Sequence, residues 1–215
     1  MPYKAVLFDL DGTLLNTINE LGDSMNASLA SLGFPTHDYA AYKFMVGDGM
    51  DTLARRALPE AHRNEETVKL CVQGMRKEYA TRWQKSPPYD GVHALLDELS
   101  RRGVLLTILS NKPDDFTKTI MTTLFPSWRW AYVAGAHADI PKKPDPAGAV
   151  QLAREVGVPA SEFLYVGDTN TDMWTANRAG MYALGALWGF RPADELTASG
   201  AKALLEKPVD VLRFL

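Results

Sequence analysis

Short apolar runs alternate with amphipathic segments along most of the chain. The apolar runs have the length of buried strands, and they are Ala5–Phe8, Leu105–Leu109, Tyr132–Ala134, Phe163–Val166 and Met181–Leu187. The segments that repeat apolar residues at helical spacing are Gly91–Arg102, Pro113–Leu124, Pro146–Val156 and Thr171–Ala179. Because strands and helices alternate, the sequence predicts an α/β fold with a doubly wound parallel sheet.

One stretch departs from this alternation. Between Thr17 and Lys85 the apolar positions keep helical spacing, and no strand pattern interrupts them. This stretch is too long for one crossover between neighbouring strands, and Ser86-Pro87-Pro88 after it would stop a helix and stiffen the return. We therefore expect an α/β core domain formed by residues 1–16 and 86–215, with an inserted helical cap domain at residues 17–85.

Composition narrows the class of protein. The 215 residues carry a formal net charge of −3 and no basic cluster, which argues against nucleic acid as a partner. No run approaches the ~20 apolar residues of a membrane span, and the first residues lack the pattern of a signal peptide. Cys71 is the only cysteine, so no internal disulfide can form. We expect a cytoplasmic protein without membrane contact; the sequence indicates no oligomeric state.

Polar residues follow the predicted strands at the point where each strand ends. They are Asp9, Asp11, Gly12 and Thr13 after the first strand, Ser110 and Asn111 after the second, Lys143 after the third, and Asp168 and Asp172 after the fourth. Ligands of open α/β sheets gather at these carboxyl ends. Each residue alone also fits a structural role, since aspartates and serines cap helices, Asp-Gly forms turns, and lysines lie on surfaces.

The combination is harder to explain by structure alone. Two like charges ~4 Å apart repel by ~4 kcal/mol at an effective dielectric constant of ~20, so converging carboxylates need cations. One lysine does not balance four aspartates. A hard cation with oxygen ligands and room for water is the natural remedy, and these features favour Mg²⁺ over Ca²⁺.

Four motifs carry a resemblance that covers nearly the whole chain. They are Asp9-Leu10-Asp11-Gly12-Thr13, Ser110-Asn111-Lys112-Pro113, Lys142-Lys143-Pro144-Asp145-Pro146 and Gly167-Asp168-Thr169-Asn170-Thr171-Asp172. In this order, and at strand ends, the set resembles the haloacid dehalogenase superfamily of phosphotransferases. The resemblance implies a phosphatase in which Asp9 attacks phosphorus to form an aspartyl-phosphate and Asp11 acts as general acid and then general base. An acid at position 11 argues against dehalogenases and phosphonate-cleaving members, which lack it.

The same resemblance implies how cofactor and phosphate are held. Mg²⁺ would bind the Asp9 side chain, the Asp11 main-chain carbonyl and Asp168. Asp172 would act through water or by orienting Lys143. The residues expected at the phosphoryl oxygens are Lys143, Ser110, the backbone N–H of Asn111, and the loop containing Gly12 and Thr13.

The predicted cap suggests a substrate class. Its Lys43–Gly49 run is similar to the specificity loop of phosphoglycolate phosphatases, which implies a small phosphorylated metabolite, 2-phosphoglycolate first. Lys43 would meet the substrate carboxylate, assisted by the turn at Gly47; the competing interpretation of Lys43 is a solvated helix lysine. Two departures from the family are Asn16, where an acid is usual, and a rather short cap.

Three alternatives stay open from the sequence. A β-phosphoglucomutase-like phosphosugar mutase shares the two aspartates and a similar cap. A pyrophosphatase or a sugar-phosphate phosphatase of the same superfamily has similar motif residues. A non-catalytic relative could use the same pocket to bind a phosphate or a partner protein.

Overall fold

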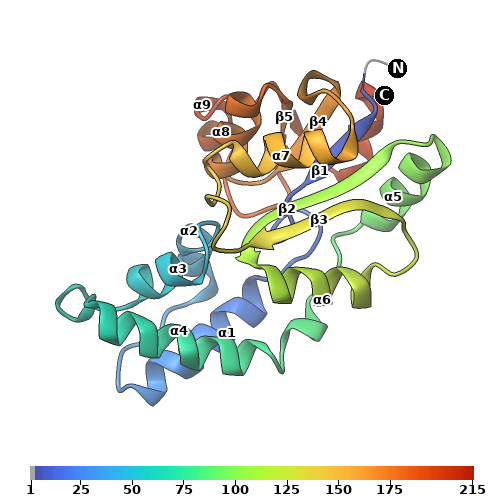
Figure 1. The fold of residues 1–215 in the computed structure, drawn as a ribbon. Helices are drawn as coiled ribbons and strands as arrows, with labels where there is room; N and C mark the ends of the chain where they lie inside the picture. Colours follow the sequence, from blue (N-terminus) through green and yellow to red (C-terminus); the bar gives the residue numbers. More distant parts are fainter. Residues whose placement is uncertain (1–2) are drawn as a thin grey trace. The chain divides into compact units, whose positions relative to one another are not determined.

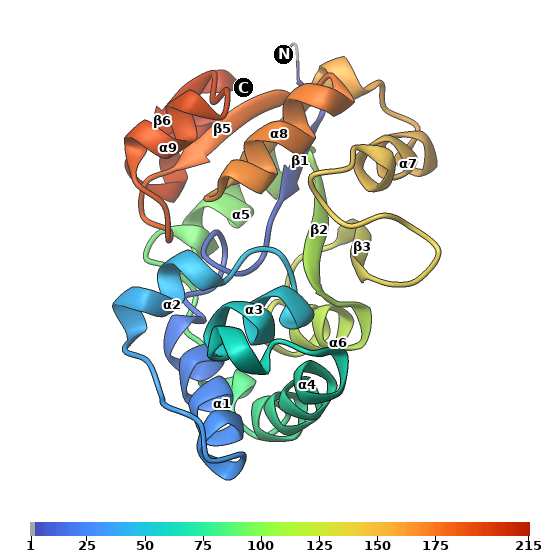
Figure 2. The same ribbon diagram turned by 90° about the vertical axis from the view of Figure 1, so that its left-hand side faces the viewer.

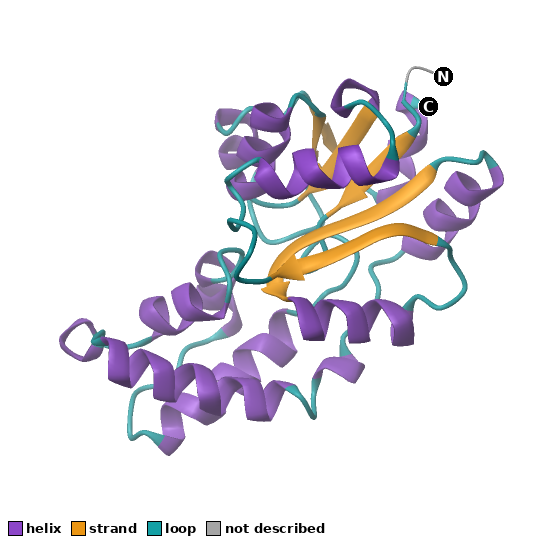
Figure 3. Cartoon of the chain, viewed as in Figure 1, coloured by secondary structure: helices purple, strands orange, loops and turns teal. Residues whose placement is uncertain are grey.

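The structure is a computed structural model that describes residues 3–215. The chain folds into two compact units. One contains the described residues up to Leu15 together with Pro88–Leu215, and the other is Asn16–Pro87. Figure 3 shows that all strands lie in the first unit, whereas the second is built from helices and loops.

A single parallel sheet forms the centre of the first unit. Its strands are β1 (Ala5–Phe8), β2 (Leu105–Pro113), β3 (Trp130–Ala136), β4 (Phe163–Gly167), β5 (Tyr182–Ala186) and β6 (Ala203–Leu205), in the spatial order β3-β2-β1-β4-β5-β6. Every residue of β1 and β4 is buried, which explains their unbroken apolar sequences. The predicted doubly wound parallel sheet is confirmed.

Helices cover both faces of this sheet. They are α5 (Val92–Arg101), α6 (Asp114–Leu124), α7 (Ala147–Val156), α8 (Asn170–Ala179) and the short α9 (Ala193–Ala198). In Figure 1, α5 and α6 lie on one face and α7 and α8 on the other. Connections between parallel strands are almost always right-handed, so the direction in which the chain moves along the sheet decides which face a helix covers. The chain moves from β1 to β2 and β3 in one direction, and after returning past β1 it moves from β4 in the opposite direction. Strand order reverses beside β1, which is where doubly wound folds bind ligands.

The second unit contains four α-helices. They are α1 (Ile18–Ser31), α2 (Tyr39–Met45), α3 (Met50–Ala57) and α4 (Glu65–Tyr79). Figure 2 shows α1 and α4 side by side. Between them the Ser28 hydroxyl donates to the Cys71 carbonyl at 2.7 Å, and Met25 and Cys71 are fully buried. Asp38 and Asn64 cap α2 and α4, since their side chains accept bonds from Ala41 and Thr67.

The strands differ from the sequence prediction in extent: β3 is longer at both ends, one end of β4 and both ends of β5 shift by one residue, and β2 and β6 differ in ways that affect the site or the sheet edge. β2 continues to Pro113 because, after an irregularity in the register beyond Leu109, Pro113 pairs with Ala136 of β3. The serine, asparagine and lysine of the second motif therefore belong to the strand end itself. β6 was not predicted, because three residues beside a sheet edge carry too little pattern to recognise.

Candidate active site

The carboxyl ends of three adjacent strands bring the motif residues together. Asp9 follows β1, Ser110 and Asn111 lie near the end of β2, Asp168 follows β4, and Lys143 lies in the loop between β3 and α7. All five side chains are buried. Charged residues are rarely buried without partners, so their contacts indicate what each can do.

Lys143 links two aspartates. Its Nζ lies 2.9 Å from an Asp9 carboxylate oxygen and 2.7 Å from an oxygen of Asp172. Asp172 also accepts bonds from the Tyr165 hydroxyl, at 3.3 Å, and from the backbone and hydroxyl of Thr169, at 3.1 and 2.8 Å. The Asp172 carboxylate is therefore occupied in holding Lys143 and the first turn of α8.

Asp168 is held from two sides. The Thr13 hydroxyl donates to one carboxylate oxygen and the backbone N–H of Phe190 to the other, each at 2.9 Å. Gly12 has a φ of 85°, and a Cβ at this position would lie 2.2 Å from an Asp168 oxygen. A Cβ at Gly189 would lie equally close to the Asp168 Cβ, at 2.2 Å. Two glycines thus let the backbone pass against this carboxylate.

The cluster carries an excess of buried negative charge. Burial raises the pKa of Asp9 to about 7, with Lys143 acting to lower it and Asp172 to raise it. Burial, Asp172 and Asp9 raise the pKa of Asp168 well above its ordinary value, although Phe190 and Thr13 act in the opposite direction. Burial acts to lower the pKa of Lys143, but Asp172 and Asp9 outweigh it and raise that pKa well above its ordinary value.

The donor set fits a divalent cation. Asp9, Asp168 and Asp172 each offer a carboxylate oxygen, and these three atoms lie within 4.8 Å of one another. Oxygen donors of this kind are those that Mg²⁺ prefers. Since Asp172 already accepts bonds from Lys143, Tyr165 and Thr169 on its two oxygens, Asp9 and Asp168 are the carboxylates better placed for an ion. A cation would also offset both the burial and the mutual repulsion that raise the pKa values of Asp9 and Asp168.

The Asn111 side chain joins the second motif to the Lys143 loop. Its Nδ2 donates to the Lys143 carbonyl at 3.0 Å, and its Oδ1 accepts from the Lys143 N–H at 2.9 Å. This paired contact positions the Lys143 backbone. Next to it, the Ser110 Oγ accepts a bond from the Lys112 N–H at 3.2 Å, which leaves its own O–H to donate.

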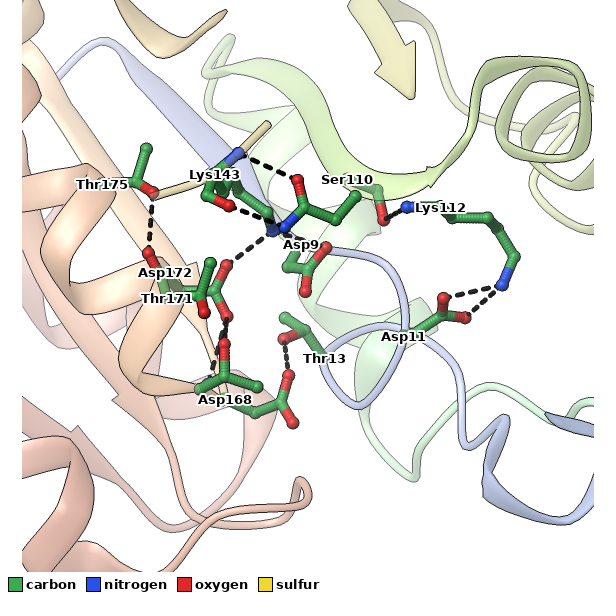
Figure 4. A network of polar contacts seen from close by, with 12 residues as sticks. Asp9, Asp11, Thr13, Ser110, Lys112, Lys143, Asp168, Thr171, Asp172 and Thr175 are labelled. Carbon is green, nitrogen blue, oxygen red and sulfur yellow. Dashed lines mark hydrogen bonds and ion pairs between the residues drawn. The ribbon is translucent and has the colours of Figure 1, made fainter. Parts of the chain in front are cut away.

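Asp11 has a partner that the sequence did not reveal. Lys112 Nζ lies 2.8 and 2.7 Å from the two Asp11 carboxylate oxygens. Figure 4 shows the Asp11 side chain turned toward Lys112 and away from Asp9. The Lys112 side chain is only 1% exposed. This bidentate ion pair is the principal contact of the site missing from the sequence prediction.

Other contributors also escaped the sequence analysis. Trp188 donates its indole N–H to the Thr13 carbonyl at 2.9 Å, and Phe190 and Gly189 support Asp168. They follow β5, a strand for which no motif was expected. An aromatic-Gly-aromatic run directly after a buried strand is the signal that could have drawn attention to them.

Lys43 and Gly47 belong to the helical unit. Lys43 is an exposed residue in the last turn of α2, and Gly47 follows that helix with a φ of 115°. Their predicted role toward a substrate stays a prediction. Asn16, the departure from the family pattern, donates its backbone N–H to the Pro87 carbonyl at 2.9 Å.

The raised pKa of Asp9 predicts a pH-dependent cost to stability. In metal-free protein, Asp9 binds its proton up to about pH 7 when folded but only to about pH 4 when unfolded. Its stabilising contribution is thus complete below about pH 4 and is lost as the pH rises through about 7. We expect Asp9→Asn to raise the free energy of unfolding, relative to wild type, on the order of 2 kcal/mol more at pH 8 than at pH 5. Urea denaturation in EDTA measures this difference; an equal effect at both pH values would contradict it.

Known proteins are similar to this chain in sequence. A family model described as haloacid dehalogenase-like hydrolase matches residues 6–186. A phosphoglycolate phosphatase of Xanthomonas campestris pv. campestris (strain 8004) is 33% identical over 207 residues, which cover 95% of this chain and 93% of that protein. Another, from Pseudomonas savastanoi pv. phaseolicola, is 32% identical over 192 residues, covering 87% and 70% of the two chains.

Solved structures are similar to this chain in fold. A crystal structure from Lactobacillus delbrueckii subsp. bulgaricus has a TM-score of 0.91 at 27% identity and covers 98% of this chain and 97% of its own. Another, described as a predicted phosphoglycolate phosphatase from Haemophilus somnus 129PT, has a TM-score of 0.89 at 25% identity, covering 100% and 98%. Among the described residues, no helix has the length and apolar content needed to cross a membrane.

Proposed function

The chain belongs to the haloacid dehalogenase-like hydrolases and is a phosphatase, and we propose that it works through a covalent intermediate on Asp9. The observation that carries this proposal is the position of Asp9. Its carboxylate is buried at the end of the central strand, with the Lys143 ammonium at 2.9 Å and Asp168 close by. A nucleophile beside fixed positive charge, at the ligand-binding edge of the sheet, suits in-line attack on a phosphoryl group.

In the first step, an Asp9 oxygen forms a bond to phosphorus while the bond to the leaving oxygen breaks. Asp11, which takes up a proton from solvent before this step, gives that proton to the leaving oxygen, so that the product leaves as an alcohol. Lys143 stabilises negative charge on the phosphoryl oxygens, and Asp172 keeps the Lys143 ammonium in place. The Ser110 hydroxyl and the Asn111 N–H supply further hydrogen bonds to the same oxygens.

In the second step, water attacks the phosphorylated Asp9. Asp11, now ionised, takes a proton from the water, and the phosphorus–Asp9 bond breaks to release inorganic phosphate. Both Asp9 and Asp11 then have their starting protonation. One residue serves as acid and then base because the second step reverses the proton demand of the first.

We propose Mg²⁺ as the cofactor, held by Asp9, Asp168 and the main-chain carbonyl of Asp11. When bound, the ion supplies Lewis-acid stabilisation of charge on the transferring phosphoryl group. Thr13 and the Phe190 N–H fix the Asp168 carboxylate for this purpose. Gly12 and Gly189 leave room for it.

We propose 2-phosphoglycolate as the substrate, supported by the names of the relatives that cover nearly the whole chain. Purified enzyme should then hydrolyse 2-phosphoglycolate with a kcat/KM at least about 10-fold higher than for ethyl phosphate, which is what about 1.4 kcal/mol from carboxylate recognition gives. Phosphate release is measured for both, with glucose 6-phosphate and pyrophosphate as comparison substrates. Equal rates for 2-phosphoglycolate and ethyl phosphate would refute the substrate and leave the phosphatase chemistry intact.

A second product analysis distinguishes a phosphatase from the alternative, a β-phosphoglucomutase-like mutase. A β-glucose 1-phosphate sample analysed for glucose 6-phosphate should yield free phosphate and no isomerised product. Formation of glucose 6-phosphate faster than free phosphate would identify a mutase instead.

A further inference from the structure

We propose that Lys112 is a positioning residue for the proton-transferring carboxylate of Asp11. The inference rests on the proposed function, in which Asp11 is the general acid and base. Lys112 gives no proton to substrate and bonds to no phosphoryl oxygen in this role. It holds the Asp11 side chain in one orientation between turnovers, from which the carboxyl group reaches the leaving oxygen.

The geometry of the pair supports this role. One ammonium group contacts both oxygens of one carboxylate, at 2.8 and 2.7 Å, and so restricts the rotation of the Asp11 side chain. Lys112 is 1% exposed and Asp11 17% exposed, so solvent screens the pair weakly and the ammonium has little freedom to leave. Exposed ion pairs that contribute little to structure do not share these features.

The position of Lys112 in the chain supports it as well. Lys112 lies at the end of β2, two residues after Ser110, and its backbone N–H donates to the Ser110 Oγ. Ser110 and Lys112 both lie in the short stretch of β2 between two residues paired with β3, Leu109 opposite Ala134 and Pro113 opposite Ala136, so the two residues are positioned together. Asp11 itself lies in the loop after β1, beyond the residues of β1 that pair with β2 and β4.

The positive charge of Lys112 would also stabilise Asp11 during catalysis. Asp11 becomes an anion in the first step and must wait as an anion for the attacking water. At that stage it stands in the same crevice as Asp168 and a phosphorylated Asp9. Like charges in a crevice shielded from water repel one another, which would drive an unpaired Asp11 carboxylate outward. The Lys112 ammonium offsets this repulsion on the side away from Asp9 (Figure 4).

Leaving-group dependence tests the proposal. An alkoxide needs the proton from Asp11 and a nitrophenolate does not, and kcat/KM reports only the steps up to formation of the phosphorylated enzyme. Lys112→Met should lower kcat/KM for ethyl phosphate at least about 10-fold and for p-nitrophenyl phosphate less than about 3-fold, part of the ~10²–10⁴ that general acid catalysis supplies. Lys112→Gln, which keeps an amide NH₂ donor group and should disturb folding less, should show the same selectivity with a smaller loss.

A double mutant separates positioning from a structural effect. Asp11→Asn combined with Lys112→Met should lose no more activity on ethyl phosphate than Asp11→Asn alone, because Lys112 then has no carboxylate to position. Lys118→Met is the matched control: it removes another lysine–aspartate pair, with Asp114 at 2.7 Å, outside the site. It should leave both substrates unchanged.

Three results would overturn the inference. Equal losses on both esters, with weaker inhibition by inorganic phosphate, would make Lys112 a phosphate-binding residue. Additive losses in the double mutant, or unchanged activity in Lys112→Met and Lys112→Gln, would remove its link to Asp11. If Asp11→Asn itself affected both esters equally, the acid role of Asp11 in the proposed function would fail instead. This outcome differs from the three above because it concerns the Asp11 variant and not the Lys112 variants.

Discussion

Asp9→Asn is expected to lower turnover by at least about 10⁴-fold, as loss of a covalent nucleophile commonly does. An amide cannot attack phosphorus, yet it has nearly the size and shape of the carboxylate it replaces. The surrounding structure should survive because Lys143 keeps Asp172 at 2.7 Å and the Asp9 backbone N–H keeps the Val166 carbonyl at 3.0 Å. Phosphate release at saturating substrate measures the loss, and circular dichroism checks the fold.

A matched control accompanies this variant. Asp90→Asn changes an exposed aspartate of the same unit and should retain wild-type turnover. Brief incubation of wild-type enzyme with substrate followed by acid quenching and mass spectrometry should place one phosphoryl group on the peptide containing Asp9. A folded Asp9→Asn protein that retained near-normal turnover, free of wild-type contamination, would show that hydrolysis does not pass through this residue.

Removal of divalent metal is expected to have the next largest effect, a loss of about 10³-fold, corresponding to several kcal/mol of charge stabilisation. Activity after EDTA treatment should return with Mg²⁺. Ca²⁺ should bind without restoring it, because Ca²⁺ prefers six to eight oxygen ligands and can take both oxygens of Asp9, which misaligns the nucleophile. Phosphate release measured under rigorous exclusion of Mg²⁺ tests this.

Thermal melting gives a second readout that does not depend on turnover. Mg²⁺ should raise the melting temperature of the EDTA-treated protein, since an ion that binds only the folded state stabilises it. Asp168→Asn should reduce that shift, because the ion loses one of its two proposed carboxylate ligands. Full activity in EDTA, or in Ca²⁺ alone, would contradict the proposed cofactor.

The sheet was predictable from the sequence because each central strand is buried on both faces. Burial on both faces produces unbroken apolar runs such as Ala5–Phe8 and Phe163–Val166, and parallel strands align their carboxyl ends. Polar residues after such runs must therefore lie near one another. The convergence of Asp9 and Asp168 follows from this reasoning before any side chain is placed, whereas Lys143 reaches them from the longer loop after β3.

The pairings inside the site were not predictable in the same way. Asp11 and Lys112 are 101 residues apart, and their contact depends on how far β2 continues past Leu109. The extension to Pro113 is set by pairing with β3, a long-range contact with no local pattern. The support of Asp168 by Gly189 and Phe190 likewise comes from the loop after β5, which only the folded sheet brings to β4.

The points where the helical unit leaves and rejoins the core lie next to each other. Leu15 and Pro88 form an antiparallel bridge, and just beyond it the Asn16 N–H donates to the Pro87 carbonyl at 2.9 Å. The insertion therefore starts and ends at almost one place, so the sheet is continuous without it, and a segment with ends this close can be inserted at little cost in loop-closure entropy. Evolution could then exchange the helical segment while Asp9, Lys143 and Asp168 stay unchanged. On the hypothesis that the Lys43–Gly49 run selects the substrate, new substrates would be acquired by replacing one contiguous stretch of gene, and a chimera made by grafting residues 16–87 from a relative should inherit the donor's substrate preference.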